Sequence, residues 1–398
     1  MNPPRPTLLR TRGGHESGKV GMVELFFDLI FVFAVTQISH ALLAEQTPLG
    51  ILHAVIILGA VWWGWVYTAW VTNWLDPERM PVRLCLFALM AAGLAMSSAI
   101  HGAFHERGLA FAIAYVTLQL GRTGFTLWAL RHETQERRRN FQRIFSWLAT
   151  AGLLWVAGGL APEGWREGLW IAALIVEFAG PATFFHTPGL GRSRIADWDV
   201  DGSHMAERCA LFVIIALGES LLVTGATFAQ TAWGLEHFAA FFSTFLGTVA
   251  MWWLYFHRGA EDAHHRIVNR ADPGRQARLA YTYIHILIIA GIIVTAVSDE
   301  IVLAHPGHLD EAGTLALIGG PLLYLLGTGF FKKTTSERGN FPLSHMVGLV
   351  LLLGLFPSGM GGLVSALTLG MATTGVMIIV AAWEHLSLAY PNPEQDEE

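Results

Sequence analysis

Charged residues are scarce in this 398-residue chain. They make up 14% of the sequence, whereas a soluble globular domain carries roughly 25%. Hydrophobic residues make up 53%, and the mean hydropathy is +0.45. Apolar runs of about 20 residues, the length needed to cross roughly 30 Å of hydrocarbon, recur along the chain. These features argue against a soluble domain and predict a polytopic integral membrane protein, with the lipid bilayer as its surroundings.

Several chemical signatures are missing as well. The only two cysteines, Cys85 and Cys209, both lie in apolar runs, which predicts free thiols used as small hydrophobic side chains. The chain has no Walker A sequence, no H-E-x-x-H, no G-x-S-x-G and no TVGYG-type filter. ATP-driven transport in cis, the commonest protease and hydrolase chemistries and a potassium filter of that type are therefore not indicated. We expect no bound cofactor and no nucleic-acid partner.

The apolar runs predict twelve membrane-spanning helices, and hence an all-α integral membrane protein. Their ranges are 23–43, 49–72, 82–101, 108–130, 142–160, 168–186, 206–228, 236–257, 279–303, 312–331, 343–358 and 363–387. If the N-terminus is cytoplasmic, all but three of the 25 basic residues fall on the inner side; the exceptions are Arg107, Arg122 and Arg166. By the positive-inside rule this distribution predicts a multi-pass protein of the bacterial cytoplasmic membrane with both termini cytoplasmic.

The two halves of the chain resemble each other. VELFFDLIFVFAV at 23–35 aligns with AERCALFVIIALG at 206–218, which pairs Glu24 with Glu207. Six helices in each half, an even number, predict a parallel repeat about an axis along the membrane normal; the alternative is chance similarity between apolar sequences. The expected organisation is a cytoplasmic N-terminal tail (1–22) without a cleaved signal peptide, a first repeat (23–186), a cytoplasmic linker (187–205), a second repeat (206–387) and an acidic C-terminal tail (388–398).

Three ionisable residues in the first half are predicted to lie at nearly one depth. At 1.5 Å per residue, Asp28 lies about 9 Å, Arg122 about 12 Å and Glu177 about 13 Å from the inner ends of their helices. One interpretation is a buried ion pair of Arg122 with Asp28 or Glu177 that fixes helix register. The other is a substrate-binding or ion-binding site in which one carboxylate remains to bind a cation or a proton.

Other polar residues in the spans are weaker candidates. Glu219, in IIALGES, is predicted about 20 Å from the inner end of its helix. It is either a protonated, hydrogen-bonded acid or the titrating group of a proton-coupled carrier. Glu24, Glu207 and His40 are secondary candidates. A lone histidine on an apolar helix is more often a satisfied core residue than a ligand.

A predicted inner loop, GAEDAHHR, contains donors that could bind a metal ion. They are Glu261, His264 and His265. Their spacing matches no recognised zinc pattern, so a solvated loop is the preferred interpretation and metal binding the alternative.

Two motifs link the chain to a known family. Through ELFFDLIFVFAVTQISH at 24–40 and AERCALFVIIALGES at 206–220, it resembles the low temperature requirement A (LtrA) family of bacterial membrane proteins over nearly its whole length. The resemblance implies a polytopic inner-membrane protein linked by name to growth in the cold, and no biochemical activity. A weaker likeness relates Phe26-Phe27-Asp28 to the Phe-Ser-Asp first helix of the endosomal and lysosomal potassium-channel family, from whose pattern Phe27 and Leu211 depart.

These observations favour a transporter or channel-like protein that moves a small solute or ion; coupling to protons is left open. A membrane-embedded enzyme that acts on a lipid or lipid-linked substrate is an alternative, as is a scaffold for a membrane stress or cold response. An enzyme is the less favoured of these classes, and assembly as a homo-oligomer is left open.

Overall fold

A computed structural model of the chain describes residues 7–10, 19–194, 201–257, 278–336 and 339–389. These residues form no strand, and each of the twelve predicted spans contains at least one helix. The all-α prediction is therefore confirmed. The chain divides into two compact units, Met1–Arg208 and Cys209–Glu398, which are described separately.

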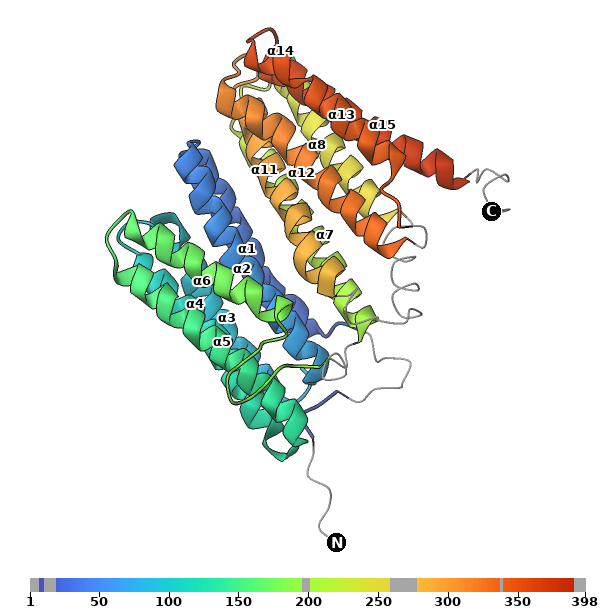
Figure 1. Cartoon of the computed structure of the whole chain (residues 1–398). Helices are drawn as coiled ribbons and strands as arrows, with labels where there is room; N and C mark the ends of the chain where they lie inside the picture. Colours follow the sequence, from blue (N-terminus) through green and yellow to red (C-terminus); the bar gives the residue numbers. More distant parts are fainter. Residues whose placement is uncertain (1–6, 11–18, 195–200, 258–277, 337–338, 390–398) are drawn as a thin grey trace. The chain divides into compact units, whose positions relative to one another are not determined.

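The first unit is a bundle of six complete helices followed by the beginning of a seventh (Figure 1). They are α1 (Met22–Ala44), α2 (Pro48–Trp74), α3 (Met80–Ala99), α4 (Gly108–Ala129), α5 (Gln135–Leu160), α6 (Trp165–Ala182) and the first residues of α7 (Gly202–Ala229). Along the bundle, α3 packs against α1 and α4, and α5 packs against α4 and α6. Helix α2 contacts α1, α4 and α6 and is buried on every side from Ile56 to Asn73. A helix that is apolar all round belongs in a protein interior, so α2 supplies the core against which polar side chains of its neighbours can be sequestered.

The second unit contains the rest of α7 and the remaining helices. They are α8 (Leu235–Phe256), the π-helical turn η4 (Arg278–Ile284), α11 (His285–Ala304), α12 (Glu311–Thr335), α13 (Leu343–Gly354), α14 (Phe356–Met360) and α15 (Ala366–Ala389). Helices α11 and α12 approach closely because glycines line their contact: a Cβ on Gly291 would lie 2.6 Å from the backbone nitrogen of Tyr324. Small residues permit this kind of packing between membrane helices. Helix α15 packs against α8 and α13.

The helix bounds differ from the predicted spans in two informative places. Helix α5 begins at Gln135 rather than at 142, because the Gln, Glu and Arg residues that precede the apolar run are themselves good helix formers. The predicted span 343–358 is interrupted at Leu355, shortly before Pro357, which has no backbone N–H to continue the hydrogen-bond ladder.

Ten spans in the described part of the chain are long and apolar enough to cross a membrane. Large apolar side chains such as Leu153 and Leu235 are exposed on the helices, as expected for surfaces that face lipid. The two remaining helices, α4 and α6, are those that carry Arg122 and Glu177. The composition and the helices together identify a multi-pass membrane protein.

Candidate functional site

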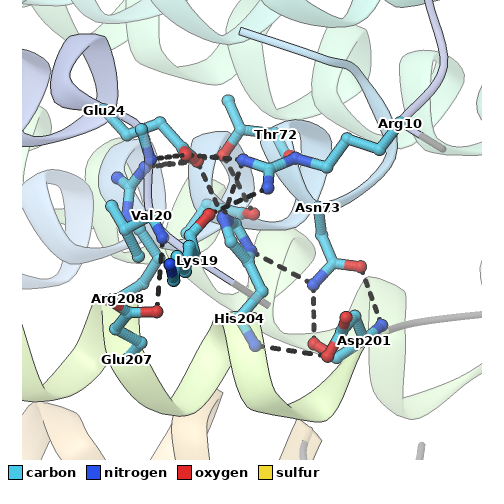
Figure 2. Close-up of polar contacts among 12 residues, drawn as sticks. Arg10, Lys19, Val20, Glu24, Thr72, Asn73, Asp201, His204, Glu207 and Arg208 are labelled. Carbon is cyan, nitrogen blue, oxygen red and sulfur yellow. Dashed lines mark hydrogen bonds and ion pairs between the residues drawn. The ribbon is translucent and has the colours of Figure 1, made fainter. Parts of the chain in front are cut away.

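Glu24 is the centre of a charged network at the beginning of α1. Its Oε2 accepts the backbone N–H of Gly21 (2.8 Å), one of the donors that a helix start leaves without an intrahelical partner. Oε2 also pairs with Nη2 of Arg10 (2.6 Å), while Oε1 accepts from Nη1 of Arg208 (3.0 Å) and lies 2.9 Å from Nε2 of His204. Figure 2 shows these groups converging on the carboxylate. Glu24 is fully buried, and both of its oxygens have partners.

Asp28 lies one helical turn further along α1 and shares Arg208 with Glu24. Its Oδ1 accepts from Nη2 of Arg208 (2.6 Å) and from Nε1 of Trp65 on α2 (2.8 Å). The guanidinium carbon of Arg208 lies 5.7 Å from the centroid of the Trp65 ring, within range of a cation–π contact. Oδ2 of Asp28 is buried and has no hydrogen-bond partner among the described residues. Asp28 is therefore ion-paired through one oxygen only, and the other can take a proton or accept a further donor.

Contacts with α2 fix the start of α7, the helix that carries Arg208. Nδ2 of Asn73 donates to the carbonyl of Asp201 (2.8 Å), and its Oδ1 accepts the N–H of the same residue (2.9 Å). Nδ2 also lies 3.2 Å from Nδ1 of His204. If Nδ1 accepts there, the ring proton is on Nε2, which is the atom that faces Glu24. These contacts join α1, α2 and the first turns of α7 (Figure 2).

Arg122 belongs to a second polar network, between α2 and α4. Its Nη1 donates to the carbonyl of Gly64 (3.2 Å) and to Oγ1 of Thr68 (3.3 Å), and its Nη2 donates to Oε1 of Gln119. The guanidinium carbon lies 5.2 Å from the centroid of the Tyr67 ring. Arg122 is 1% exposed, so its guanidinium group has these uncharged protein groups as partners in place of water.

The same network continues from Gln119 to Glu177 on α6. Nε2 of Gln119 donates to the hydroxyl of Tyr115 (2.7 Å), and that hydroxyl donates to Oε2 of Glu177 (2.6 Å). Oε1 of Glu177 accepts from Nε1 of Trp155 on α5 (3.3 Å). Arg122 and Glu177 are thus the two ends of a buried chain, separated by one amide and one phenol.

The expected cluster of Asp28, Arg122 and Glu177 is divided between these two networks. Among the described residues, no ion pair joins Arg122 to either carboxylate, so the first of the two interpretations, a direct ion pair with Asp28 or Glu177, finds no support. Asp28 is paired with Arg208 instead. Equal depth along parallel helices does not fix the direction in which a side chain points, and this is why the depth estimate could not choose the partners.

Comparison with known proteins identifies the family. Residues 19–382 match the family described as bacterial low temperature requirement A protein (LtrA). The chain belongs to the LtrA family. An uncharacterized protein of Rhizobium meliloti (strain 1021) is 41% identical to this LtrA chain over 375 residues, which cover 94% of the chain and 90% of the relative. No solved structure matches it.

Other predicted residues of the LtrA chain lie outside both networks. Glu219 on α7 is 6% exposed, and no hydrogen bond joins it to another described residue. Glu207 is exposed, and its Oε2 accepts the backbone N–H of Val20 at 3.2 Å, a contact that ties the segment before α1 to α7. His40 is exposed at the far end of α1. The structure thus gives these three residues quite different surroundings.

The remaining predictions concern metal and thiol groups. Glu261, His264 and His265 lie outside the described residues. Within the described part of the chain, no group of three His, Cys, Asp or Glu side chains is arranged to hold a metal ion. Neither Cys85 nor Cys209 forms a disulfide, as predicted.

Sequence reasoning missed the residue that links both acids of α1. Arg208 was counted among the cytoplasmic positive charges, although it lies two residues inside the predicted span 206–228. That depth matches Glu24 within about 3 Å, and comparing it would have paired the two. Tyr115, Gln119 and Arg122 were also recognisable, because positions i, i+4 and i+7 share one helix face.

Proposed function

We propose that this LtrA protein moves a small ion or solute across the bacterial cytoplasmic membrane, linked to protons. The observation that carries the proposal is the buried chain from Arg122 through Gln119 and Tyr115 to Glu177. Its carboxyl group is one that can bind and release a proton, and Tyr115 is within hydrogen-bond distance to pass that proton on. Ionisable residues within membrane helices are rare and typically mark ion or proton pathways.

A purely structural role explains this chain less well. A staple between helices would place the guanidinium directly against the carboxylate, since an ion pair that is not in contact recovers little of the cost of burying two charges. Here Arg122 and Glu177 are held apart by two neutral side chains. Such an arrangement keeps each charge supported by hydrogen bonds while leaving the carboxylate free to change its protonation state.

The network around Arg208 has a different role in this proposal. Glu24 and Asp28 carry two negative charges, and Arg10 and Arg208 carry two positive charges, so the group is balanced. It joins α1, α2 and α7 at the end of α1 that we propose to be cytoplasmic. We infer that it positions these helices, and that the open oxygen of Asp28 is a second place where a proton can bind.

A cavity at the opposite end of α1 supports entry of a solute into the first unit. Its volume is about 310 Å³, and its lining includes Ile57, Phe104, His53 and Glu45. Pockets that bind small molecules have volumes of roughly 300–1,000 Å³ and combine apolar walls with a few polar groups. His53 lies 3.6 Å from Glu45, and His101 and His105 also line the cavity, so it combines apolar walls with several polar groups.

The proposed topology has both termini in the cytoplasm and two six-helix halves related as a parallel repeat. The excess of basic residues in the segments assigned to the inner side supports the orientation. The pairing of Glu24 with Glu207 supports the repeat, as does the presence of six predicted spans on each side of the linker. In the repeat alignment Leu211 stands opposite Asp28 and Gly327 opposite Arg122, so these two charges belong to the first half alone.

Flux into proteoliposomes tests the proposal. Purified protein is reconstituted, and the movement of protons, Na⁺ and K⁺ is followed with entrapped indicators while the membrane potential is clamped. We expect flux of at least one of these ions above protein-free liposomes, and we expect Glu177→Gln and Tyr115→Phe to lower it to background. Glu163→Gln, in the exposed loop before α6, is the matched control and should keep the wild-type rate.

Two results would contradict the proposal. Wild-type liposomes no more permeable than protein-free ones to all three ions would remove the support for ion movement. Unchanged flux in Glu177→Gln, Asp28→Asn and Glu219→Gln would show that these acids take no part in it.

A further inference from the structure

A small polar cavity lies among four helices of the second unit. Its volume is about 20 Å³, and it is lined by residues of α8, α11, α12 and α15. A cavity must offer roughly 10–15 Å³ to hold one water molecule, so this one accommodates a single small occupant. Apart from one carboxylate, its polar groups are uncharged.

Asp299 on α11 is that carboxylate. It is 6% exposed, and its Oδ2 is buried with no hydrogen-bond partner among the described residues. No ion pair joins it to a described basic residue, and no arginine, lysine or histidine lines the cavity. A buried carboxylate without a partner is costly in a membrane interior. A cation bound in the cavity would offset this cost.

The hydroxyl groups around Asp299 present lone pairs rather than protons to the cavity. Ser298 donates its proton to the carbonyl of Thr295 (2.8 Å), Thr244 donates to Phe241 (3.0 Å) and Thr373 donates to Gly370 (3.0 Å). Since a hydroxyl has one proton, each of these oxygens is left with acceptor capacity only. In this arrangement their protons are directed to backbone carbonyls, and their oxygens are available to coordinate a cation.

Two further hydroxyls of the lining, on α8 and α15, have the same character. Oγ1 of Thr374 donates to the carbonyl of Ser243 (3.2 Å), and Oγ of Ser243 lies 3.4 Å from Oγ1 of Thr374. The hydroxyl of Thr295 is buried without a partner among the described residues. The cavity is therefore rich in acceptor oxygens, and Thr295 has the one lining hydroxyl proton not engaged in these contacts.

Helix α12 contributes two residues to the lining. Pro321 lies in the helix interior and has no N–H to bond the carbonyl of Leu317 four residues earlier. Both residues line the cavity.

The polar groups converge at one level of the bundle. At 1.5 Å per residue, Ser243, Asp299 and Thr373 lie about 12, 8 and 10 Å from the ends of α8, α11 and α15. The beginning of α15 is joined to the loop that follows α11 by a hydrogen bond from Leu367 N to Pro306 O (2.9 Å). The cavity is thus inside the bundle, about two helical turns from that loop.

We propose that this cavity is a binding site for one dehydrated sodium ion, held by Asp299 together with the Thr295, Ser298 and Thr373 oxygens. Oxygen ligands are those that hard cations prefer. One carboxylate balances one positive charge, whereas a divalent ion would leave an uncompensated charge in apolar surroundings. Mg²⁺ also retains several waters, for which a cavity of about 20 Å³ has no room. An ionised carboxylate attracts the smaller Na⁺ more strongly than K⁺, because the distance between the charges is shorter.

The site stands apart from the proposed transport function. It is built from residues of the second unit, and none of them belongs to the networks of Glu24 or Glu177. Sodium binding at Asp299 does not require that the protein transport anything, so its test needs no measurement of flux.

Equilibrium binding of radioactive sodium to the purified full-length protein tests the site. The protein is prepared in choline chloride, and sodium is added at constant ionic strength. We expect one saturable site per chain, no saturable binding to Asp299→Asn and about tenfold weaker binding to Thr295→Val, which corresponds to about 1.4 kcal/mol. Glu300→Gln, the next residue on α11 and not part of the lining, should bind like the wild type.

Thermal stability supplies the second readout. Sodium should raise the melting temperature of the wild type and of Glu300→Gln, and should leave that of Asp299→Asn unchanged. In sodium-free buffer Asp299→Asn should be at least as stable as the wild type, because it removes an unpartnered buried charge. Absence of saturable binding to the wild type, binding to Asp299→Asn at wild-type affinity, or competition by potassium as effective as that by sodium would overturn the proposal. A water molecule beside a protonated Asp299 would give the first of these results.

Discussion

Removal of Arg208 should destabilise the first unit by more than any exposed charge can. Arg208→Met keeps most of the side-chain volume and deletes the guanidinium group that donates to both Glu24 and Asp28. Glu24 retains Arg10, His204 and a backbone N–H as partners. Asp28 retains only the indole N–H of Trp65, so the uncompensated charge falls mainly on Asp28.

The expected magnitude follows from the burial of the pair. Removing one partner of a buried ion pair costs roughly 3–5 kcal/mol, and both side chains are completely buried here. For a unit of this size such a loss lowers the melting temperature by on the order of 10 °C. Asp28→Asn added to Arg208→Met should restore part of the loss, because the charge left unpaired is then absent. The coupling energy between the two substitutions should be about 0.5–3 kcal/mol.

The assay is the thermal stability of detergent-solubilised protein, followed by size-exclusion chromatography after heating. Arg83→Met is the matched control, since Arg83 pairs with Glu78 at 2.6 Å on the surface, and such pairs contribute roughly 0–1 kcal/mol. If Arg208→Met melts within the range of Arg83→Met, or if Asp28→Asn restores nothing, the ion pair does not hold the helices together as described.

Two further substitutions test packing and pairing in the second unit. Gly291→Ala should lower the free energy of unfolding by roughly 1–3 kcal/mol, as overpacking does, because the added Cβ would lie 2.6 Å from a backbone nitrogen of α12. Gly319→Ala is the control and should leave stability unchanged, since no atom lies within 4 Å of its added Cβ. Equal melting temperatures of the two variants would refute this packing. Lys332→Met should cost roughly 3–5 kcal/mol of stability, because Lys332 Nζ lies 2.6 Å from both carboxylate oxygens of Glu384. Lys333→Met, at the exposed neighbouring position, is the control and should keep nearly wild-type stability. A mild effect of Lys332→Met would contradict the importance of this ion pair.

Much of the fold was predictable because membrane helices reveal themselves by length and apolarity. Each predicted span contains a helix, and the main errors arose where a helix extends beyond its apolar run or where one span is divided into two helices. Helix α5 extends past its apolar run into an arginine-rich segment, which hydrophobicity alone excludes from a span although the residues favour a helix.

The candidate site was predictable only in part. The buried charges Asp28, Arg122 and Glu177 were recognised, because an ionisable residue in an apolar run stands out. Their partners were not, since pairing depends on which way each helix is turned about its axis. Arg208 was taken for a cytoplasmic charge, although its position at the end of a span fits either role.

Asp299 was missed for a related reason. It is followed by Glu300 close to the end of α11, and an acidic pair there resembles the start of a solvated loop. Only the packing of α8, α12 and α15 around α11 reveals that Asp299 is buried while its neighbour Glu300 is half-buried. Charge placement near helix ends is thus the point at which sequence reasoning is weakest in this protein.

The most direct test of the proposed function is the rate of ion flux in proteoliposomes that contain Glu177→Gln, compared with Glu163→Gln and the wild type. The account predicts that Glu177→Gln falls to the rate of protein-free liposomes while the exposed-loop variant keeps the wild-type rate. Equal rates in all three proteins would contradict the claim that a proton is bound and released at Glu177.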